Sequence, residues 1–381
     1  MHRFAFVLHP LRYEDFALKY KFTRFLPQRV VELGFKLVPP MVVGHVTGVR
    51  SATGAELEGW LIGLPLTPKV LLTAPYSWVL SRLEQAGRLA EELGAEILGL
   101  GAFTKIAGDR GVSLARRLRI PVTTGNSYTT ATAVEGALKA ARQMGIDLHS
   151  AQVTVIGATG SIGKATCHVL APEIRRLVVV ARRVEALSAL ADQLQARYPQ
   201  LEVEVSTEID RAVSQADIVI AVSAAQEAIV KPETLKPGAV VCDVARPRNL
   251  SPVVNERRSD VLVIDGGVIE VPGERADMGF NFGFPPRMVE ACMAETMILA
   301  LEGRLENFTL GPDIEIEKVH EIHRMGARHG FRLAGFRRFE RAIDDGEIAL
   351  IRQRALRQFE QRRDRPALRD AMSSESVESP S

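Results

Sequence analysis

An apolar run that meets three glycines constrains this chain more than any other stretch. Residues 153–156 are apolar or β-branched, a helix-forming run extends over 164–170, and a second apolar run covers 177–181. Strand, glycine turn, helix and strand form the unit that holds a dinucleotide, with the phosphates at the helix N-terminus. The alternative is a plain strand-to-helix turn with small residues. The expected cofactor-binding residues are Gly157, Thr159, Gly160, Ser161, Ile162 and Gly163.

The end of the second strand of this unit indicates which nucleotide is bound. A site for NAD would place an acidic residue about 20 residues after the first glycine, where it binds the ribose 2′-hydroxyl. This chain has Ala181, Arg182 and Arg183 there, without a carboxylate. A guanidinium pairs with a 2′-phosphate, so the sequence predicts NADPH, bound by Arg182 with help from Arg183. The alternative is two solvated arginines that open a helix.

Length and composition limit the remaining possibilities. A chain of 381 residues predicts two domains with a tail, and a net charge of +2 gives no reason to expect a nucleic-acid partner. Its three cysteines are too few for a disulfide framework and lack metal-ligand spacing, so we expect no metal and a cytoplasmic location. We also expect no signal peptide and no membrane-spanning segment.

Residues 1–150 are expected to form a first α/β domain that binds the substrate. Alternation and turn signals predict a strand at Phe4–Leu8 and a hairpin over 42–62. Short apolar runs predict strands at Val70–Ala74 and Ile97–Leu100, with a helix over Trp78–Leu93 between them. The alternation of strand and helix indicates a domain with its own sheet.

Two polar loops follow apolar strands in this first domain. One runs from Leu98 to Lys105, and the other from Thr123 to Thr129, before a helix over Ala131–Met144. Ligands bind outside the carboxyl ends of such strands. Asn126 is therefore a candidate to fix a substrate carbonyl or hydroxyl, although an Asn or Thr that caps the helix is an equally good interpretation.

Residues 151–275 are expected to form the nucleotide-binding domain, a doubly wound parallel sheet. Buried-type apolar runs continue through 203–205, 216–222, 239–245 and 261–265. Ser223 follows the fourth of these strands and Gly266 follows the last. In a doubly wound sheet these loops lie near the nicotinamide end of a cofactor, so both residues are predicted to bind it.

Residues 276–365 are expected to be helices that pack back on the first domain, followed by a disordered tail at 366–381. One helix is predicted from Arg287 to Glu302 with Pro286 at its start, a second over Glu315–His329, and an arginine-rich one over Phe331–Arg363. His329 precedes Gly330 at a helix end, where a cation would suit the helix dipole; the alternative is a C-terminal capping residue. The predicted fold is therefore α/β, with two α/β domains.

Cys292 is expected about two turns into the first of these helices. Its apolar neighbours favour a structural cysteine that is buried in the core. The same interpretation is favoured more strongly for Cys167 and Cys242. The alternative makes Cys292 a thiolate that accepts an acyl group. Its sequence surroundings do not identify an activating group.

Taken together, ordered motifs along the chain resemble the long-chain acyl-[acyl-carrier-protein] reductases of cyanobacterial alkane biosynthesis, which have a shikimate dehydrogenase-like fold. The resemblance covers roughly residues 42–332. It is carried by residues 51–54, 98–106, 123–126, 140–147, 157–163, 181–182, 248–250, 266–270, 291–295, 302–303, 307–308, 316–318 and 328–331.

This resemblance implies an enzyme that uses NADPH to reduce an acyl thioester, carried by acyl carrier protein or coenzyme A, to a fatty aldehyde. It places Cys292 where the family has its nucleophilic cysteine, which forms a thioester intermediate. Lys105, Tyr128 and Ala102 depart from the family pattern, where a small hydroxyl residue, a histidine and a glycine stand. These departures leave the acyl specificity open.

Two other functions remain open at this stage. Lys105 could act as a general acid in an NADP-dependent alcohol or keto-acid dehydrogenase of the shikimate dehydrogenase type, or could be a surface lysine. The chain could also be a non-catalytic NADP(H)-binding protein. An arginine-rich tail could be a solvated helical face, or could bind an acidic carrier protein or an anionic membrane; its arginines are 337, 338, 341, 352, 354, 357, 362 and 363.

Overall fold

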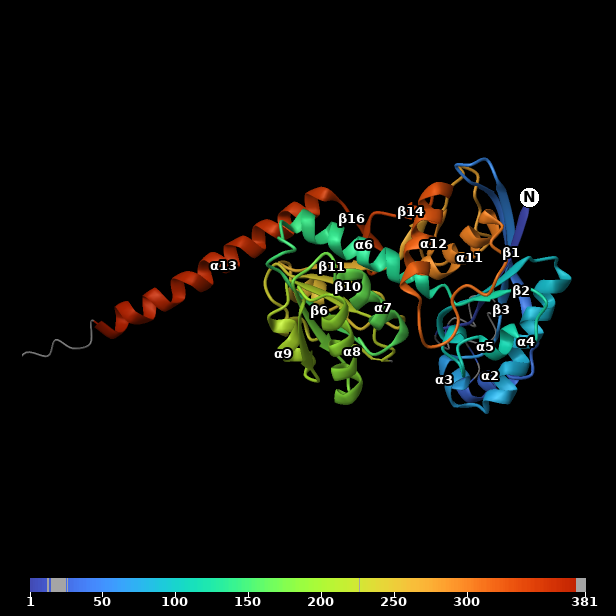
Figure 1. The fold of residues 1–381 in the computed structure, drawn as a ribbon, viewed down its shortest axis with the longest axis horizontal. Helices are drawn as coiled ribbons and strands as arrows, with labels where there is room; N and C mark the ends of the chain where they lie inside the picture. The colour runs from blue at the N-terminus through green and yellow to red at the C-terminus, as the bar shows by residue number, and fades with distance from the viewer. Residues whose placement is uncertain (12–13, 15–24, 26, 226, 375–381) are drawn as a thin grey trace, which may run out of the picture. The chain divides into compact units, whose positions relative to one another are not determined.

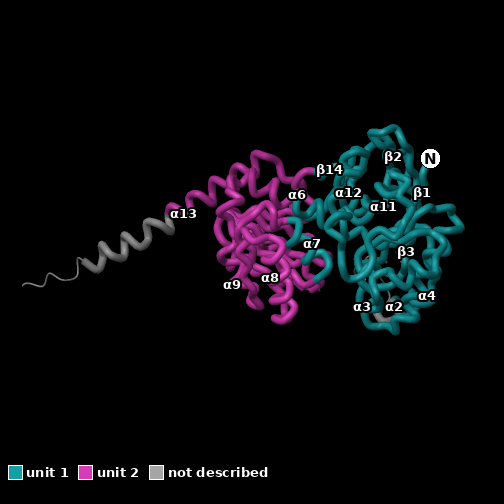
Figure 2. Tube along the Cα trace, viewed as in Figure 1, with its two compact units in different colours: residues 1–134, 160–169, 266–334 teal, residues 135–159, 170–265, 335–381 magenta. Residues whose placement is uncertain are grey.

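A computed structural model of the chain describes all residues except 12–13, 15–24, 26, 226 and 375–381. The chain divides into two compact units, coloured separately in Figure 2. Unit 1 comprises residues 1–134, 160–169 and 266–334, and unit 2 comprises residues 135–159, 170–265 and 335–381. The chain therefore passes between the units several times, once within the helix α6 (Asn126–Met144).

Unit 1 is built on a five-stranded sheet with the order β2-β3-β1-β4-β5. Only β2 is antiparallel to its neighbour, and the other pairs are parallel. Buried aliphatic and aromatic side chains such as Phe4 and Leu61 cover the sheet. The strands are β1 (His2–Leu8), β2 (Met41–Arg50), β3 (Glu56–Gly63), β4 (Ile97–Leu100) and β5 (Val122–Thr123).

Helices cover this sheet, and a small antiparallel sheet with the order β13-β12-β14 completes unit 1. Apart from the first half of α6, the helices are α2 (Gln28–Phe35), α3 (Pro68–Thr73), α4 (Tyr76–Glu92), the 3₁₀ helix η3 (Ala102–Lys105), α5 (Val112–Ala115), α7 (Ser161–Leu170), α11 (Ala291–Glu302) and α12 (Ile316–His329). The small sheet consists of β12 (Val268–Glu270), β13 (Met288–Glu290) and β14 (Arg332–Leu333).

Unit 2 contains a six-stranded parallel sheet with the order β11-β10-β9-β6-β7-β8 (Figure 1). Counted along the chain, this is the doubly wound order of a dinucleotide-binding fold, so the predicted α/β class is confirmed. Five of its strands are short, largely buried apolar runs, whereas the edge strand β8 alternates valine with glutamate and is partly exposed. The six strands are β6 (Gln152–Ile156), β7 (Arg176–Val180), β8 (Glu202–Ser206), β9 (Ile218–Ala221), β10 (Val240–Asp243) and β11 (Leu262–Asp265).

The other elements of unit 2 are the second half of α6, a set of helices, and a two-stranded hairpin. The helices are α8 (Val184–Arg197), α9 (Ile209–Ser214), the 3₁₀ helix η4 (Pro232–Thr234), α10 (Val254–Arg257) and α13 (Asp345–Ser374). The hairpin joins β15 (Phe336–Arg338) to β16 (Arg341–Ile343). Among the described residues, no helix has both the length and the apolar character needed to cross a membrane.

The expected strand at Val70–Ala74 is wrong, because this segment forms the helix α3. Thr67 is its N-cap residue and Pro68 stands at its start, where the fixed φ of proline favours a helix. Val70 and Leu71 are the buried residues of this single short helix. An apolar run of this length fits a strand and a buried helical turn equally well.

The expected helix start at Arg287 is also wrong. Residues Met288–Glu290 form the strand β13, which pairs with β12 so that Val268 lies opposite Glu290 and Glu270 opposite Met288. The helix α11 therefore begins at Ala291 and not with Pro286 in its first turn. This moves Cys292 from the middle of a helix to its N-terminal turn.

The segment expected to be helical from Phe331 to Arg363 begins instead with three short strands, and its helix α13 starts at Asp345. Phe336 and Ile343 face each other in the hairpin and are both buried. The helix extends to Ser374, so the expected boundary of the tail at residue 366 falls inside α13, and residues 375–381 lie outside the described residues.

Candidate functional site

Cys292 occupies the second position of α11, after Glu290 as N-cap and Ala291 as first residue. It is half-buried, whereas Cys167 and Cys242 are fully buried. The first N–H groups of a helix have no partner within the helix and create a positive end. A thiolate at this position is stabilised by that end, so Cys292 alone among the three cysteines is placed for nucleophilic chemistry.

Two glycine turns of unit 1 hold the first turn of α11. A Cβ at Gly125 would lie 2.3 Å from the Cys292 Cα, and Gly125 has a φ of +72°, so only glycine fits there. The Ala291 N–H donates to the Gly267 carbonyl at 2.7 Å. Gly267 therefore contacts the first turn of α11 directly, and the Thr123–Asn126 loop lies against the cysteine itself.

Lys105 reaches this site from the 3₁₀ helix that follows β4. The strand β4 lies under α11, because a Cβ at Gly99 would meet the hydroxyl of Thr296, one turn after Cys292. His9 fixes the start of the 3₁₀ helix: its Nε2 accepts the Phe103 N–H at 2.9 Å, and its Nδ1 donates to the Pro10 carbonyl at 2.9 Å. Burial lowers the pKa of His9 to about 4, so the ring stays neutral in this role.

The charges around the Cys292 sulfur act in opposite directions. Burial is the largest effect and raises the pKa of the Cys292 thiol above its ordinary value. The Lys105 ammonium and the Met293 N–H lower the pKa of this thiol, whereas the Glu290 and Glu295 carboxylates raise it. Lys105 is thus the cation available to stabilise a thiolate here.

Most hydroxyl groups of the Thr123–Thr132 segment are used within the protein. Thr123 donates to Glu295, Thr124 donates to the Thr309 carbonyl, and Ser127 bonds to the Thr309 hydroxyl. The remaining threonines donate to carbonyls of the preceding turn of α6. Within this described segment, the buried side-chain oxygen recorded without a partner is Oδ1 of Asn126. The helix α6 starts at this residue, so its amide is available to a ligand.

The glycine loop after β6 has the geometry that a bound dinucleotide requires. Gly157 has a φ of +86°, and a Cβ there would lie 2.9 Å from the backbone of Ser223. Gly163 is buried within α7, which starts at Ser161. Up to Thr159 the loop belongs to unit 2, and from Gly160 to Val169 the chain belongs to unit 1. The free N–H groups at the start of α7 fit the phosphates of a dinucleotide.

The loop after β9 is held in place by a residue without an expected role. The Ser223 N–H donates to Oδ1 of Asn249 at 3.0 Å, and the Asn249 amide nitrogen donates to the Ser223 carbonyl at 3.3 Å. Asn249 is fully buried. The residues 248–250, known from the sequence only as part of a resemblance, thus position the loop expected to meet the nicotinamide.

Arg182 and Arg183 lie at the carboxyl end of β7, and both are exposed. Arg183 is the N-cap residue of α8. No hydrogen bond or ion pair is recorded for either guanidinium within the described part of the chain. Two free guanidinium groups at this edge of a doubly wound sheet fit the 2′-phosphate of NADP(H).

A second polar network lies at the other end of α11. His329 is buried, with its Nδ1 2.7 Å from the Ser51 hydroxyl and its Nε2 2.8 Å from a Glu302 carboxylate oxygen. Arg328 donates to the other oxygen of Glu302. His329 is the last residue of α12, and Gly330 is its C-cap residue. Glu302 lies ten residues after Cys292, about 15 Å along the helix.

The structure explains the surroundings of Tyr128, whereas nothing in it explains why alanine replaces glycine at position 102. Tyr128 is buried, and its ring lies against Gly326 of α12, where a Cβ would be 2.7 Å from the phenol oxygen. Ala102 has a φ of +45°, the left-handed backbone that favours glycine. Of the three departures, Lys105 alone brings a new charge to Cys292.

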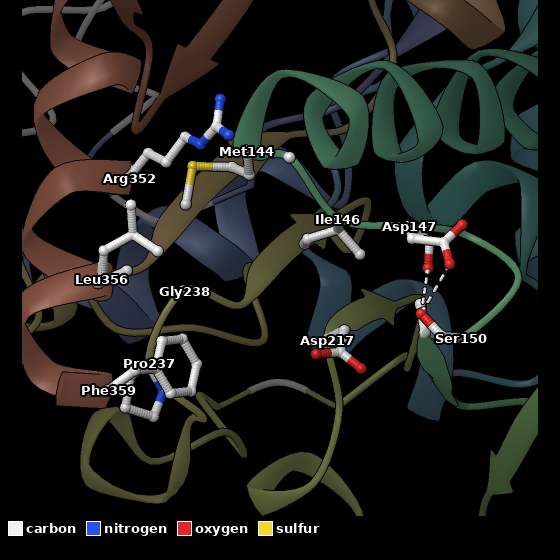
Figure 3. A pocket seen from close by; sticks show the side chains of 13 residues that line it. Met144, Ile146, Asp147, Ser150, Asp217, Pro237, Gly238, Arg352, Leu356 and Phe359 are labelled. Carbon is white, nitrogen blue, oxygen red and sulfur yellow. Dashed lines mark hydrogen bonds between the residues drawn. The ribbon is translucent and has the colours of Figure 1, made fainter. Parts of the chain in front are cut away.

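A cavity of about 220 Å³ lies in unit 2, between α13 and the start of strands β6, β9 and β10 (Figure 3). Met144, Leu356 and Phe359 form apolar walls, and the guanidinium of Arg352 lies over Gly145. None of the expected catalytic or cofactor-binding residues lines it. Two of the tail arginines, Arg338 and Arg341, form ion pairs with Glu347. Three others are exposed: Arg352, Arg354 and Arg357. The side chains of Arg362 and Arg363 lie outside the described residues.

Comparison with known proteins identifies relatives of several kinds. The shikimate / quinate 5-dehydrogenase family matches residues 139–266. The long-chain acyl-[acyl-carrier-protein] reductase of Synechococcus elongatus is 32% identical over 308 residues, covering 77% of this chain and 87% of the relative. The aminotransferase PigE of a Serratia species is 31% identical over 92% of this chain, which spans 42% of PigE. A glutamyl-tRNA reductase of Pseudomonas aeruginosa is 31% identical over 44% of this chain and 45% of its own length.

Solved structures resemble the chain only distantly. L-tryptophan dehydrogenase from Nostoc punctiforme aligns over 94% of this chain and 89% of its own, with a TM-score of 0.41 and 14% identity. Quinate dehydrogenase from Corynebacterium glutamicum aligns over 85% of this chain and 98% of its own, with a TM-score of 0.38 and 12% identity. Neither similarity is high enough to bear on function.

Proposed function

Because the chain belongs to the family that includes the long-chain acyl-[acyl-carrier-protein] reductase of Synechococcus elongatus, we propose that it reduces an acyl thioester to an aldehyde with NADPH. The observation that carries this proposal is the position of Cys292: a half-buried thiol in the first turn of α11, whose pKa is lowered by the charge of Lys105. The proposed substrate is the acyl thioester of a carrier protein or of coenzyme A.

The first step is an acyl transfer to Cys292. Its thiolate attacks the carbonyl carbon of the substrate, the bond from that carbon to the carrier sulfur breaks, and the carrier thiolate leaves and takes up a proton. Lys105 stabilises the attacking thiolate, and the start of α11 adds a second positive influence. The carbonyl oxygen of the substrate needs a hydrogen-bond donor, so we assign it to the side-chain NH2 group of Asn126 and not to the unpartnered Oδ1, which can only accept.

The second step releases the product from the enzyme. NADPH, when bound, supplies the hydride that the thioester carbon accepts. The bond from that carbon to the Cys292 sulfur then breaks, the aldehyde leaves, and the thiolate is restored. Ser223 and Gly266 are proposed to contact the nicotinamide end, and the glycine loop 157–163 the phosphates, through backbone N–H groups.

An assay of NADPH oxidation with a long-chain acyl-CoA or an acyl carrier protein tests this function. We expect aldehyde to form with the wild-type protein, and turnover to fall roughly 10³-fold or more in Cys292→Ser, since the acyl-enzyme cannot form efficiently. Cys167→Ala, at a buried cysteine with no proposed role, is the matched control and should keep its activity. Full activity in Cys292→Ser would refute the proposal.

The same variants separate the reductase from a dehydrogenase that depends on Lys105. An alcohol or keto-acid dehydrogenase would lose turnover in Lys105→Met and keep it in Cys292→Ser. A protein that only binds NADP(H) would show cofactor affinity without turnover on thioesters or alcohols. The reductase loses most activity in Cys292→Ser and only part of it in Lys105→Met.

Cofactor choice gives an independent prediction. Arg182→Ala removes an exposed guanidinium proposed to bind the 2′-phosphate, so the dissociation constant for NADPH should rise about 10- to 100-fold, as expected for a hydrogen bond to a charged group. The affinity for NADH should be unchanged, because NADH lacks that phosphate. Fluorescence titration with both nucleotides measures this, and an equal loss for the two would contradict the assignment.

A further inference from the structure

Glu295 carries a buried carboxylate that belongs to no expected function. It lies on α11 one turn after Cys292 and is fully buried. Three groups donate to it: the Thr123 hydroxyl at 2.5 Å, the Tyr128 N–H at 2.7 Å and the Thr309 hydroxyl at 2.9 Å. An acidic side chain is rarely buried unless its oxygens are occupied in this way, so the surrounding structure is built around the carboxylate.

The donors come from three separate parts of the chain. Thr123 ends β5 and precedes the loop, while Tyr128 lies in the first turn of α6 beyond it. Thr309 lies after α11 and holds the same loop from another side: its carbonyl accepts the Thr124 N–H at 2.9 Å, and its hydroxyl bonds to Ser127 at 2.8 Å. Glu295 therefore ties both ends of the Thr123–Tyr128 loop to the helix that carries the cysteine.

That loop is the part of the protein that lies against the thiol residue. Gly125 is so close to Cys292 that a Cβ would be 2.3 Å from the Cys292 Cα and 2.5 Å from its carbonyl oxygen. Asn126, whose Oδ1 lacks a partner within the described residues, is the next residue. If the two ends of the loop were released, Gly125 and the Asn126 amide would move relative to the sulfur.

We propose that Glu295 is a positioning residue of this site, which holds the Thr123–Tyr128 loop so that the Asn126 amide faces the acyl group on Cys292. The inference rests on the proposed reductase function and deepens it. Glu295 touches neither substrate nor cofactor in this role. It acts through the hydroxyls of Thr123 and Thr309 and through the N–H of Tyr128.

The position of Glu295 has a second, electrostatic consequence. Its carboxylate raises the pKa of the Cys292 thiol, whereas the Lys105 ammonium lowers it. Glu295→Gln keeps the size of the side chain but removes this charge and weakens the hold on the loop. The variant should therefore combine a thiol that ionises more readily with a less active enzyme, a pair of changes that a loss of stability alone does not produce.

Three measurements on the full chain test the proposal, and two of them do not need turnover. Hydrogen exchange follows the amides of residues 123–130, iodoacetamide alkylation against pH follows the Cys292 thiol, and steady-state kinetics gives kcat and KM. In Glu295→Gln we expect faster exchange in this segment, an alkylation midpoint at lower pH than in the wild type, and a kcat lower by roughly tenfold or more with a smaller change in KM.

Matched variants separate positioning from general damage. Thr309→Val removes a hydroxyl that donates to Glu295, and Thr309→Ser keeps it, so only the first should speed exchange at 123–130 and lower kcat. Glu302→Gln is the control: it alters a carboxylate of the same helix, which bonds to His329 and Arg328 and not to the loop. This variant should show wild-type exchange at residues 123–130 and a wild-type alkylation midpoint. If Glu295→Gln does not fold, the comparison of Thr309→Val with Thr309→Ser still tests whether Glu295 positions the loop.

Two results would overturn the inference: wild-type exchange and alkylation in Glu295→Gln, or equal behaviour of Thr309→Val and Thr309→Ser. The failure of the proposed function is a different result. If the wild-type protein reduces no thioester, the reductase assignment fails, while the exchange and alkylation data still show whether Glu295 holds the loop on Cys292.

Discussion

The two ends of α11 hold carboxylates in polar networks that differ in one respect. At the C-terminal end, Glu302 receives hydrogen bonds from His329 and Arg328, and the other nitrogen of His329 meets Ser51. At the N-terminal end, Glu295 is equally well occupied, but a half-buried thiol and an unpartnered amide oxygen lie beside it.

This difference separates a structural network from a candidate site. A network whose polar groups bond to one another stabilises the fold and offers nothing to a ligand. A site keeps some groups open within a framework that holds them still. Residues of both networks belong to the motifs of the resemblance, so a motif alone does not distinguish the two roles.

Replacing a glycine at each end should give the largest contrast. Gly125 and Gly303 have similar φ values, +72° and +68°, so alanine strains the backbone at both by about 1–2 kcal/mol. At Gly303 a Cβ meets nothing within 4 Å, whereas at Gly125 it collides with Cys292. Gly125→Ala should lower kcat/KM on the order of 10²-fold and Gly303→Ala should not, as steady-state kinetics and denaturant unfolding would show. Equal losses of activity in Gly125→Ala and Gly303→Ala would contradict the proposed difference between the two ends of α11.

Removing the cation next to the thiol should have a smaller effect with a defined sign. Lys105 lowers the pKa of the Cys292 thiol, so Lys105→Met should raise that pKa further. The thiolate fraction near neutral pH then falls, and the alkylation profile moves to higher pH. Lys105→Arg keeps a cation and serves as control. An unchanged alkylation profile in Lys105→Met would show that Lys105 does not influence the Cys292 thiol.

The C-terminal network should show an effect on stability without an effect on chemistry. His329→Ala leaves Glu302 and Ser51 without their central partner, so the free energy of unfolding should fall by about 1–3 kcal/mol. The kcat/KM of the remaining folded enzyme should stay close to the wild-type value. Urea denaturation and kinetics at a temperature where the variant is folded measure both. A loss of kcat/KM without a loss of stability would place His329 in the catalytic site.

The doubly wound sheet could be predicted because its signals are local. Five of its six strands are short apolar runs, and the glycine turn after β6 is bounded by elements close to it in sequence. The strand β13 could not be predicted in this way, since its partner β12 lies some twenty residues earlier and only the pairing of Ile269 with Val289 defines it. Because β13 occupies residues 288–290, α11 starts at Ala291 and Cys292 lies in its first turn.

The hairpin β15–β16 could not be predicted from the sequence for a different reason. Its turn residues Phe339 and Glu340 have φ values of +50° and +70°, a geometry that normally signals its presence through Asn-Gly or similar pairs. Contacts made far away in the chain hold it: Asp265 accepts the Glu340 N–H at 2.8 Å, and the Arg248 guanidinium lies 5.1 Å from the centre of the Phe339 ring.

The candidate site was only partly accessible from sequence. Cys292, Lys105 and Asn126 could be named from a resemblance and from loop composition, and the structure brings them together with Gly125 in unit 1. Glu295 and Asn249 lie within motifs of the resemblance, but their roles depend on bonds to residues distant in sequence, so no local pattern indicated what either residue does. A glutamate within an apolar helical run was a further signal that Glu295 has a specific partner.

The central claim is that Cys292 accepts the acyl group, and trapping the acyl-enzyme tests it most directly. The protein is incubated with a long-chain acyl-CoA without NADPH, quenched in acid and digested, and the peptides are measured by mass spectrometry. We predict an acyl group on the peptide that contains Cys292, absent in Cys292→Ser and released as aldehyde when NADPH is added. An enzyme that forms aldehyde while Cys292 stays unmodified, or while Cys292→Ser remains fully active, would contradict the account.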